Sequence, residues 1–413
     1  MSLLGPIVVV AEEPDTLLVQ ALAKAGAHPV VEARWCDAPS VVSSVNPGAV
    51  VIADLAAANS TFADALAERI AQSEPFLPMI ARLHDDDRVL PGTLPVPADA
   101  PPERLAARVA LALRLRTLHA TVLDGARMLK SERNIVADIP ADDPIEDATV
   151  LVIGRGASHA ALGVAVGERM GVMGALSVEA AARCLSAREI DGVVLGDGLP
   201  VRGVAAFLML LDQEPRFRDL PVAMLGRTAD FRMPRNFVQA RDPENLVERL
   251  LPLVRLHAFE ARLRRLLKSI ECQGALDART GLLTIEAFGH ELVGAINNAG
   301  ERGLALSLAR FSFEQAVDRR ASRDAARIAS RLARELDFAC RDDDGSLLFA
   351  FTETDLKAAH VVARRLASAL KHTMLKPEHG LNMGPSLILA TLKPSDTVFT
   401  LLSRVALHPV AAA

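Results

Sequence analysis

Short apolar segments alternate with helical patterns in this chain, and the same succession occurs twice. This repeat constrains the fold more than any other feature of the sequence. In the first copy, β-branched segments at 7–10 and 49–53 flank a helical pattern, and an apolar segment at 78–83 precedes a long helical stretch. The second copy has its apolar segments at 149–153, 191–197, 219–226 and 236–240. Strands that alternate with helices form parallel sheets, so the sequence predicts two related α/β domains with doubly wound parallel sheets.

Composition also indicates where these domains end. The stretch 135–148 is rich in Pro and Asp and follows a predicted helix at about 103–132, which is typical of a linker. Residues 243–270 repeat apolar positions at helical spacing with arginines on the opposite face, which predicts an extended helix. Its first half could pack on its own sheet, and its second half could pack on another protomer. The expected divisions are domains at 5–134, 149–255 and 276–413, a linker at 135–148 and a connecting helix at 256–275.

The charge and the cysteine spacing exclude several classes of protein. A net charge of −5 argues against a general polyanion binder, so nucleic acid is not expected as a partner. The four cysteines form no CxxC pair, which argues against a zinc cluster or a disulfide framework. The longest apolar stretch, near 204–211, is too short to span a bilayer. We expect a cytoplasmic protein with no bound metal, no cofactor and no membrane insertion.

Acidic residues stand at strand ends in both copies. Glu12 and Glu13 follow the first predicted strand, while Asp54 and Asp197 follow the third predicted strand of their copies. These positions resemble those of response-regulator receiver domains, whose fold is flavodoxin-like. In receivers, carboxylates hold Mg²⁺, an Asp at the third strand accepts a phosphoryl group, and a Lys at the fifth strand pairs with that group. The resemblance implies two tandem flavodoxin-like receiver domains, with Asp54 as a candidate phosphoacceptor.

Most of the receiver chemistry is missing from both copies. The residues that replace the acids and the lysines are Ala11, Val96, Arg155 and Gln239. Strict spacing also puts the residue before Asp54, and the residue before Asp197, at the acceptor position. An Asp that caps the turn after a strand is therefore the competing interpretation for both. The resemblance implies that the second copy is not phosphorylated and that the domains serve as dimerisation surfaces, so a homodimer is expected.

Two segments beyond residue 271 carry a second resemblance. The segment 276–288 follows the pattern DxLTGLxNRRxF, with Arg279 in place of a leucine. The residues that it keeps are Asp277, Thr280, Gly281, Leu282 and Phe288. The segment 334–370 has an RxxD sequence, five further residues, a hairpin, an apolar strand and a helix. Together they resemble the GGDEF domain, the α+β fold of diguanylate cyclases.

The catalytic residues of that family are absent. Cyclisation of two GTP molecules requires carboxylates that hold two Mg²⁺ ions and glycines that let the backbone approach the nucleotide. Residues 343–347 read DDGSL in place of GGDEF, Ala309 stands at the other metal-carboxylate position, and Val317 stands where an Asn reads guanine. The acids 342–344 could instead hold a metal, but adjacent acids in a hairpin favour a solvated turn. The resemblance therefore implies a chain that is not an enzyme.

In contrast to the catalytic residues, the residues of a second site of GGDEF proteins, an inhibitory or sensing site, have counterparts in this sequence. Arg334 and Asp337 form an RxxD sequence five residues before the degenerate signature, and Arg365 stands at the family's third ligand position. A guanidinium donates to a guanine edge or a phosphate, and a carboxylate accepts from guanine N–H groups. Arginine is frequent between 319 and 341, so a chance RxxD at a solvated helix end is the competing interpretation. The resemblance implies a cyclic di-GMP site at these three residues.

The domain order resembles that of the PleD-like response regulators, including members that bind cyclic di-GMP without making it. This resemblance implies a non-catalytic effector at a cell pole, acting as a signalling or protease-adaptor hub in bacterial cell-cycle control. By resemblance its partners are the adaptor RcdA, the regulator CtrA and the ClpXP protease. An arginine of the second copy, Arg155 or Arg183, could complete the ligand site. The alternative is a protein-interaction scaffold with a vestigial RxxD, controlled by partners or by phosphorylation of Asp54.

Overall fold

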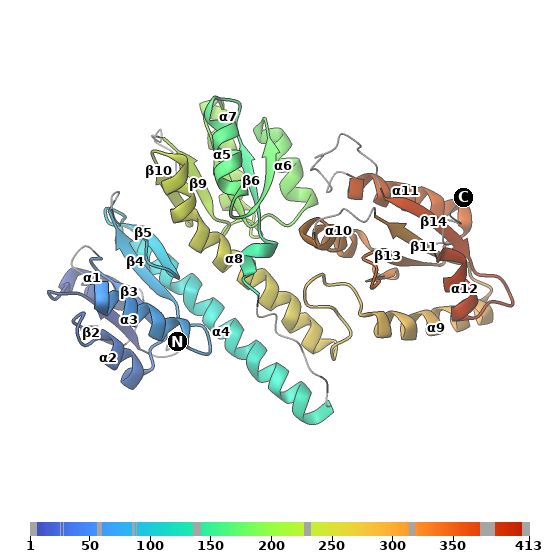
Figure 1. The fold of residues 1–413 in the computed structure, drawn as a ribbon, viewed down its shortest axis with the longest axis horizontal. Coiled ribbons are helices and arrows are strands. Elements are labelled where there is room, and N and C mark those ends of the chain that lie inside the picture. Colours follow the sequence, from blue (N-terminus) through green and yellow to red (C-terminus); the bar gives the residue numbers. More distant parts are fainter. Residues whose placement is uncertain are drawn as a thin grey trace. The chain divides into compact units, whose positions relative to one another are not determined.

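The computed structural model divides the chain into two compact units, 1–127 with 141–264, and 128–140 with 265–413 (Figure 1). The residues that the structure describes are 6–24, 26–27, 29–55, 60–84, 87, 89–133, 135, 142–226, 233–313, 319–371 and 385–406. The first unit holds two parallel sheets and the second unit holds one antiparallel sheet.

The first parallel sheet has the strand order β2-β1-β3-β4-β5. Its elements are β1 (Ile7–Val10), α1 (Thr16–Lys24), β2 (Val30–Ala33), α2 (Ala38–Val45), β3 (Ala49–Ile52), α3 (Ser60–Ala71), β4 (Met79–Leu83), β5 (Thr93–Pro97) and α4 (Pro102–Arg133). Every residue of β1 and β3 is buried, as expected for central strands covered on both faces. This strand order is one of the common doubly wound orders.

The second parallel sheet repeats this arrangement with the order β10-β9-β8-β6-β7. Its elements are the 3₁₀ turn η1 (Pro144–Asp147), β6 (Thr149–Ile153), α5 (Ser158–Gly167), β7 (Gly171–Ala175), α6 (Val178–Ala187), β8 (Gly192–Leu195), α7 (Val201–Gln213), β9 (Val222–Leu225), β10 (Phe237–Ala240) and α8 (Pro243–Glu271). Counted from its own first strand, this is again the order 2-1-3-4-5. The parallel sheets predicted from the sequence are confirmed.

The segment expected as a linker at 135–148 is structured over its second half. Asp143 accepts two hydrogen bonds from Arg255 of α8, at 3.0 and 2.9 Å. Asp147 is paired with Arg262 of the same helix at 3.1 Å, and both side chains are buried. The acids that suggested a flexible linker therefore fix this segment to α8. Residues 136–141 lie outside the described residues.

The connecting helix expected at 256–275 differs from the structure at both ends. Helix α8 begins at Pro243, so the connecting part continues the terminal helix of the second parallel-sheet domain. It ends at Glu271, because Gln273 and Gly274 adopt positive φ angles of 58° and 81°. A left-handed residue just beyond the last turn is the usual way for a helix to end.

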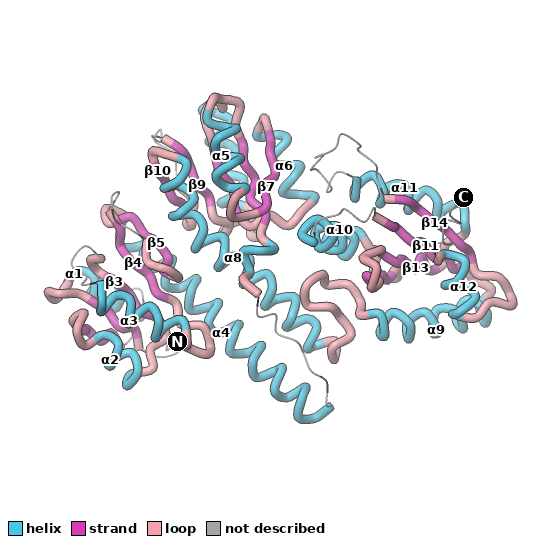
Figure 2. The backbone as a smooth tube through the Cα atoms, in the orientation of Figure 1, coloured by secondary structure: helices cyan, strands magenta, loops and turns pink. Residues whose placement is uncertain are grey.

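The antiparallel sheet of the second unit has the order β12-β13-β11-β14, within a β-α-β-β-α-β succession typical of ferredoxin-like folds. Its elements are α9 (Ile285–Arg302), β11 (Leu306–Ser312), α10 (Arg319–Leu332), β12 (Phe338–Arg341), β13 (Leu347–Thr352), α11 (Leu356–Lys371), β14 (Ser386–Thr391) and α12 (Val398–Val405). Side chains of α10 and α11 pack on one face of the sheet, and those of α9 and α12 pack on the other. Figure 2 shows these helices beside the strands. In the described part of the chain, no helix is long and apolar enough to cross a membrane.

Candidate functional site

The RxxD residues lie in the turn between α10 and β12. Helix α10 ends at Leu332, and the backbone N–H of Asp337 donates to the carbonyl of Arg334 at 3.1 Å, which closes the turn. The Asp337 carboxylate accepts a hydrogen bond from the N–H of Thr352, at the end of β13, at 3.2 Å. The Thr352 hydroxyl donates in return to the carbonyl of Leu336 at 2.9 Å. The turn is therefore fixed to the sheet at its β12 edge.

The electrostatics of this turn favour a charged ligand. Partial burial raises the pKa of Asp337, although the hydrogen bond from Thr352 and the nearby charge of Arg334 act in the opposite direction. The Arg334 side chain is exposed and makes no hydrogen bond or salt bridge with the residues that the structure describes. The structure therefore brings Arg334 and Asp337 together, with a guanidinium that is available to a ligand.

Arg365 lies on the exposed surface of α11. Leu356, nine positions earlier, faces β14, and nine residues at about 100° each place Arg365 on the opposite side of the helix. That side faces away from β14, and α10 packs beside α11. Within the described ranges no hydrogen bond or ion pair joins Arg365 to Arg334 or Asp337. The third predicted ligand residue is thus accessible, on the α10 side of its helix, without direct contact to the other two.

The degenerate signature forms a closed hairpin turn between β12 and β13. The N–H of Asp342 donates to the carbonyl of Ser346 at 2.8 Å, and Gly345 takes a φ of +83° that favours glycine. The Asp344 carboxylate accepts from both the N–H and the hydroxyl of Ser346, at 2.9 and 2.6 Å. The acids of this hairpin therefore serve the turn itself.

The pairing of Arg310 with the hairpin acids is a feature of the site that sequence reasoning missed. Its Nη2 lies 2.9 Å from Asp342 Oδ2 and 2.5 Å from Asp344 Oδ2. Burial would raise the pKa of Asp344, but hydrogen bonds from Ser346 and Arg310 lower it below its usual value. The signal that could have revealed this contact is a basic residue directly after Ala309, the position where the cyclase family has a metal carboxylate.

Ala309, which the sequence places at a metal-carboxylate position of the GGDEF pattern, offers no ligand side chain. Ala309 is fully buried and packs in the core under α10 and α11. No cluster of His, Cys, Asp or Glu suited to a metal ion occurs among the residues that the structure describes. Val317, at the position of the guanine-reading Asn, lies outside the described residues.

The segment 276–288 forms a hydrogen-bonded turn beside α10. The Asp277 carboxylate accepts from the N–H of Arg279 at 3.1 Å, and the N–H of Gly281 donates to the carbonyl of Asp277 at 2.7 Å. Gly281 has a φ of +76°, and its carbonyl accepts from Ser330 of α10 at 3.2 Å. The residues retained from the family pattern thus build a turn that packs on α10.

The candidate receiver sites lie after β3 and β8. Asp54 is exposed two residues beyond β3. Asp197 occupies the equivalent place, because the N–H groups of Ala53 and Gly196 donate to Val10 and Ile153, the last residues of β1 and β6. The Asp197 carboxylate accepts a hydrogen bond from Ser158, the first residue of α5, and this bond lowers the pKa of Asp197.

The positions of the receiver lysine and acids are also visible. The Gln239 amide donates to the carbonyl of Gly226, so this side chain of β10 binds the backbone just after the neighbouring strand β9. The Arg155 guanidinium donates to the carbonyl of Leu176 beside the same strand ends. A basic side chain therefore follows β6 at this end of the sheet.

The chain matches no protein-family model and no curated protein sequence. It is similar to the coiled coil and GGDEF domain of DgcB from Caulobacter crescentus in complex with c-di-GMP, at 20% identity, over 35% of this chain and 83% of that chain, with a TM-score of 0.29. It is also similar to the FimX GGDEF domain from Pseudomonas aeruginosa, at 17% identity, over 32% and 88% of the two chains, with a TM-score of 0.27.

Proposed function

We propose that this chain is a non-catalytic effector that binds cyclic di-GMP at Arg334, Asp337 and Arg365. The observation that carries the proposal is the RxxD turn, in which a half-buried carboxylate is fixed to β13 beside an exposed arginine. Ionisation of a carboxylate whose pKa is raised by burial costs free energy, and groups with such perturbed pKa values are concentrated at functional sites. The register of Arg334, Asp337 and Arg365 in the sequence supports the same site.

The chemistry of the turn suits a guanine base. Only one hydrogen bond to the Asp337 carboxylate, that from Thr352, is present among the described residues. The carboxylate can therefore also accept from guanine N1–H and N2–H, while the Arg334 guanidinium can donate to O6 and N7 or to a phosphate. A cyclic dinucleotide has two bases and two phosphates, which suits a site whose two arginines stand on different elements.

The proposal that the chain makes no cyclic di-GMP rests on the hairpin. Phosphoryl transfer to a ribose hydroxyl needs carboxylates free to hold Mg²⁺. Asp342 and Asp344 are instead paired with Arg310, and Ala309 has no ligand atom. A fixed guanidinium in this place repels a metal ion.

At a finer level, we propose that the two parallel-sheet domains are degenerate receivers that dimerise. Their strand order 2-1-3-4-5 is also that of receiver proteins. The domain order resembles PopA, a cyclic di-GMP effector, and from this resemblance we propose a protease-adaptor hub that engages RcdA, CtrA and ClpXP at a cell pole. These partners rest on the resemblance alone.

Calorimetric titration of the full chain with cyclic di-GMP, with GTP as control ligand, tests the proposal. Loss of a bidentate charged contact costs about 1 to 3 kcal/mol, so Arg334→Ala and Asp337→Ala should weaken binding by about 5- to 150-fold. Arg365→Ala should weaken binding by a smaller factor in the same direction. The matched control is Arg364→Ala, because Arg364 is exposed on the β14 side of the same helix turn.

The titration also separates this proposal from a scaffold with a vestigial RxxD. A scaffold would show no heat of binding at micromolar cyclic di-GMP. Equal losses of affinity for Arg364→Ala and Arg365→Ala would mean that only the charge of the helix matters. Turnover of GTP by the purified chain would contradict the non-catalytic assignment.

A further inference from the structure

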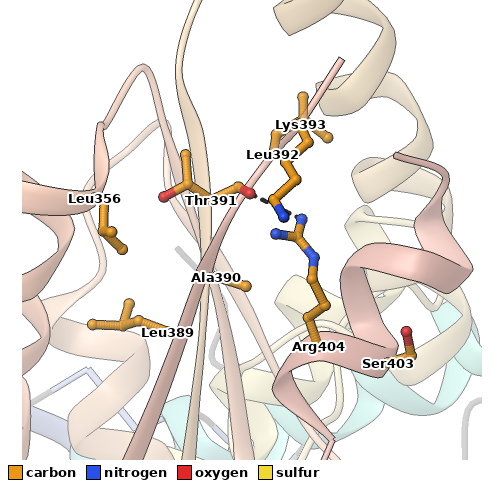
Figure 3. A pocket seen from close by; sticks show the side chains of 8 residues that line it. All are labelled: Leu356, Leu389, Ala390, Thr391, Leu392, Lys393, Ser403 and Arg404. Carbon is orange, nitrogen blue, oxygen red and sulfur yellow. Dashed lines mark hydrogen bonds between the residues drawn. The ribbon is translucent and has the colours of Figure 1, made fainter. Parts of the chain in front are cut away.

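A groove of about 670 Å³ runs along β14 (Figure 3). The groove is lined by residues 389–393, which are the end of β14 and the two residues that follow it, by Leu356 of α11 and by Arg404 of α12. Helices α11 and α12 pack on opposite faces of the sheet, so a groove that touches both helices and the consecutive residues 389–393 must follow the edge of β14. Figure 3 shows Leu356 and Leu389 on one side of the strand and Arg404 on the other.

The backbone of β14 offers hydrogen-bonding groups to this groove. In the described part of the chain, β14 pairs only with β11, which makes it an edge strand. The N–H of Leu392 donates toward β11, to Leu306, so the N–H and C=O groups of the alternate residues Leu389 and Thr391 point outward. Arg404 donates to the Thr391 carbonyl at 2.9 Å from the groove side, in agreement with this register. The outward groups of Leu389 are thus able to pair with a further strand.

The rim of the groove is basic. The β14 side of α11, defined by Leu356, carries exposed polar residues at helical spacing. These residues are Lys357, His360, Arg364 and Lys371. Lys393 adds a further charge at the end of the strand. Of the acids near this end of the sheet, Asp396 is paired with Arg404, Asp355 accepts from the N–H of Ala358 at the start of α11, and Glu353 is exposed.

We propose that the free edge of β14 binds an extended acidic segment of a partner protein as an additional strand. The outward backbone groups of β14 would supply the hydrogen bonds, and the alternate side chains of the segment that face α11 would be acids that pair with its lysines and Arg364. The β14 edge is opposite to the β12 edge, where the RxxD turn lies, so both sites can be occupied at once. The proposal does not depend on cyclic di-GMP binding.

The test uses fluorescence anisotropy with the full chain and a labelled ten-residue peptide of alternating Glu and Val, blocked at both ends. We expect saturable binding that is at least tenfold tighter than that of the corresponding Lys and Val peptide. A Glu and Val peptide with N-methyl groups on alternate amides should lose binding, because it cannot complete the strand ladder. Cyclic di-GMP at saturation should leave the peptide affinity unchanged.

Charge-reversal variants locate the site. Lys357→Glu and Arg364→Glu should each weaken peptide binding by about threefold to tenfold, and their exposure means that the fold is retained. Lys268→Glu, on the exposed side of α8, makes the same change in net charge and should leave affinity unchanged. Equal effects of all three variants would show that peptide affinity depends only on the net charge of the chain, and this would overturn the proposal.

Other outcomes would also overturn it. Binding of the Lys and Val peptide with equal affinity would show that acidic side chains are not recognised. Binding of the N-methylated peptide would show that the peptide does not pair with β14 through backbone hydrogen bonds. If the probe binds only after deletion of residues 372–384 or 407–413, the groove belongs to the chain's own segments. If binding disappears at concentrations where light scattering shows self-association, a second copy covers this edge.

Discussion

Arg310 of β11 and Asp342 of the hairpin form an ion pair, with 2.9 Å between Nη2 and Oδ2. The same nitrogen contacts Asp344 across the turn. The Arg310 side chain is only 12% exposed, so its charge is screened less by water than that of a surface arginine. One guanidinium thus pairs with two of the three consecutive acids of the hairpin.

Replacement of Arg310 by methionine should destabilise the C-terminal domain. Asp344 is 46% exposed, so part of the interaction is lost to solvent, and we expect the free energy of unfolding to fall by about 1 to 2 kcal/mol. Urea denaturation of the full chain measures this change. The control is Asp343→Asn in the same turn, which should change stability by less than about 0.5 kcal/mol because Asp343 has no contact with Arg310. Similar losses for both variants would show that Arg310 does not hold the hairpin.

Asp337→Asn should separate stability from ligand binding. Burial raises the pKa of Asp337, so its contribution to stability is present below its unfolded pKa and is lost as pH rises through its folded pKa. At pH 7 the ionised carboxylate is a cost, and an asparagine oxygen can still accept from Thr352. Denaturation at pH 4 and pH 7 should therefore give equal or higher stability for the variant at pH 7.

The same variant should bind cyclic di-GMP about 5- to 150-fold more weakly, since an amide presents donors to the donors of guanine. Calorimetry at pH 7 measures this loss. Unchanged affinity in Asp337→Asn, with stability reduced, would make Asp337 a structural residue of the turn and not a ligand.

The sequence revealed the elements of the fold because each depends on local patterns. Segments such as 149–153 are short, apolar and β-branched, and the burial of β6 on both faces follows from that composition. The RxxD turn was also visible, since its residues are neighbours in the chain. The pairing of Arg310 with Asp344 was not, because 34 residues separate them and only the β11 and β13 ladder brings them together.

Two other features also depend on contacts between segments that are far apart in the sequence. The composition of 135–148 predicts a linker, but acids of this stretch bind arginines of α8 that lie more than a hundred residues away in the sequence. The groove beside β14 arises from strand order, which depends on which crossovers form, and no single segment encodes it. Residue types were thus predictable, whereas their partners required the tertiary structure.

Asp197 should not accept a phosphoryl group. Its carboxylate is bound by Ser158, and the N–H groups of Arg155 and Gly156 donate to its carbonyl at 3.2 and 3.3 Å. A Cβ added to Gly156 would lie 2.1 Å from Cγ of Asp197, so one side of the exposed carboxylate lies against the backbone of this loop. Intact mass after incubation with acetyl phosphate and Mg²⁺ should show no adduct that is lost in Asp197→Asn. Stoichiometric modification at Asp197 would contradict this, and an adduct lost in Asp54→Asn would assign the acceptor to the first domain.

His257 of α8 should make stability depend on pH. Burial alone would lower the pKa of His257, but the hydrogen bond to Asp191 and the charges of Asp191, Glu260 and Glu189 raise it above 6.5. The stabilisation is therefore complete below the unfolded pKa and is lost as pH rises through the folded pKa. Urea denaturation between pH 6 and pH 9 should show this decline in the wild-type chain and not in His257→Gln. The control His290→Gln, at an exposed site on α9, should keep the wild-type slope.

Arg108→Met should stabilise the first unit. Arg108 of α4 is 1% exposed, and none of the residues that the structure describes forms a hydrogen bond with its Nε, Nη1 or Nη2. Burial, and then the charge of Arg104, lower the pKa of Arg108 to about 9. An unpaired buried charge opposes folding, and methionine fills a similar length with apolar atoms, so we expect the free energy of unfolding to rise by about 1 to 3 kcal/mol.

The matched control is Arg114→Met on the same helix, where the side chain is 60% exposed and pairs with Asp219. That change should stay within about 0.5 kcal/mol of wild type, because exposed pairs contribute little. Urea denaturation measures both variants. If Arg108→Met lowers stability by more than Arg114→Met does, the guanidinium must be solvated or paired in solution, and Arg108 then contributes to the packing of α4 through its charge.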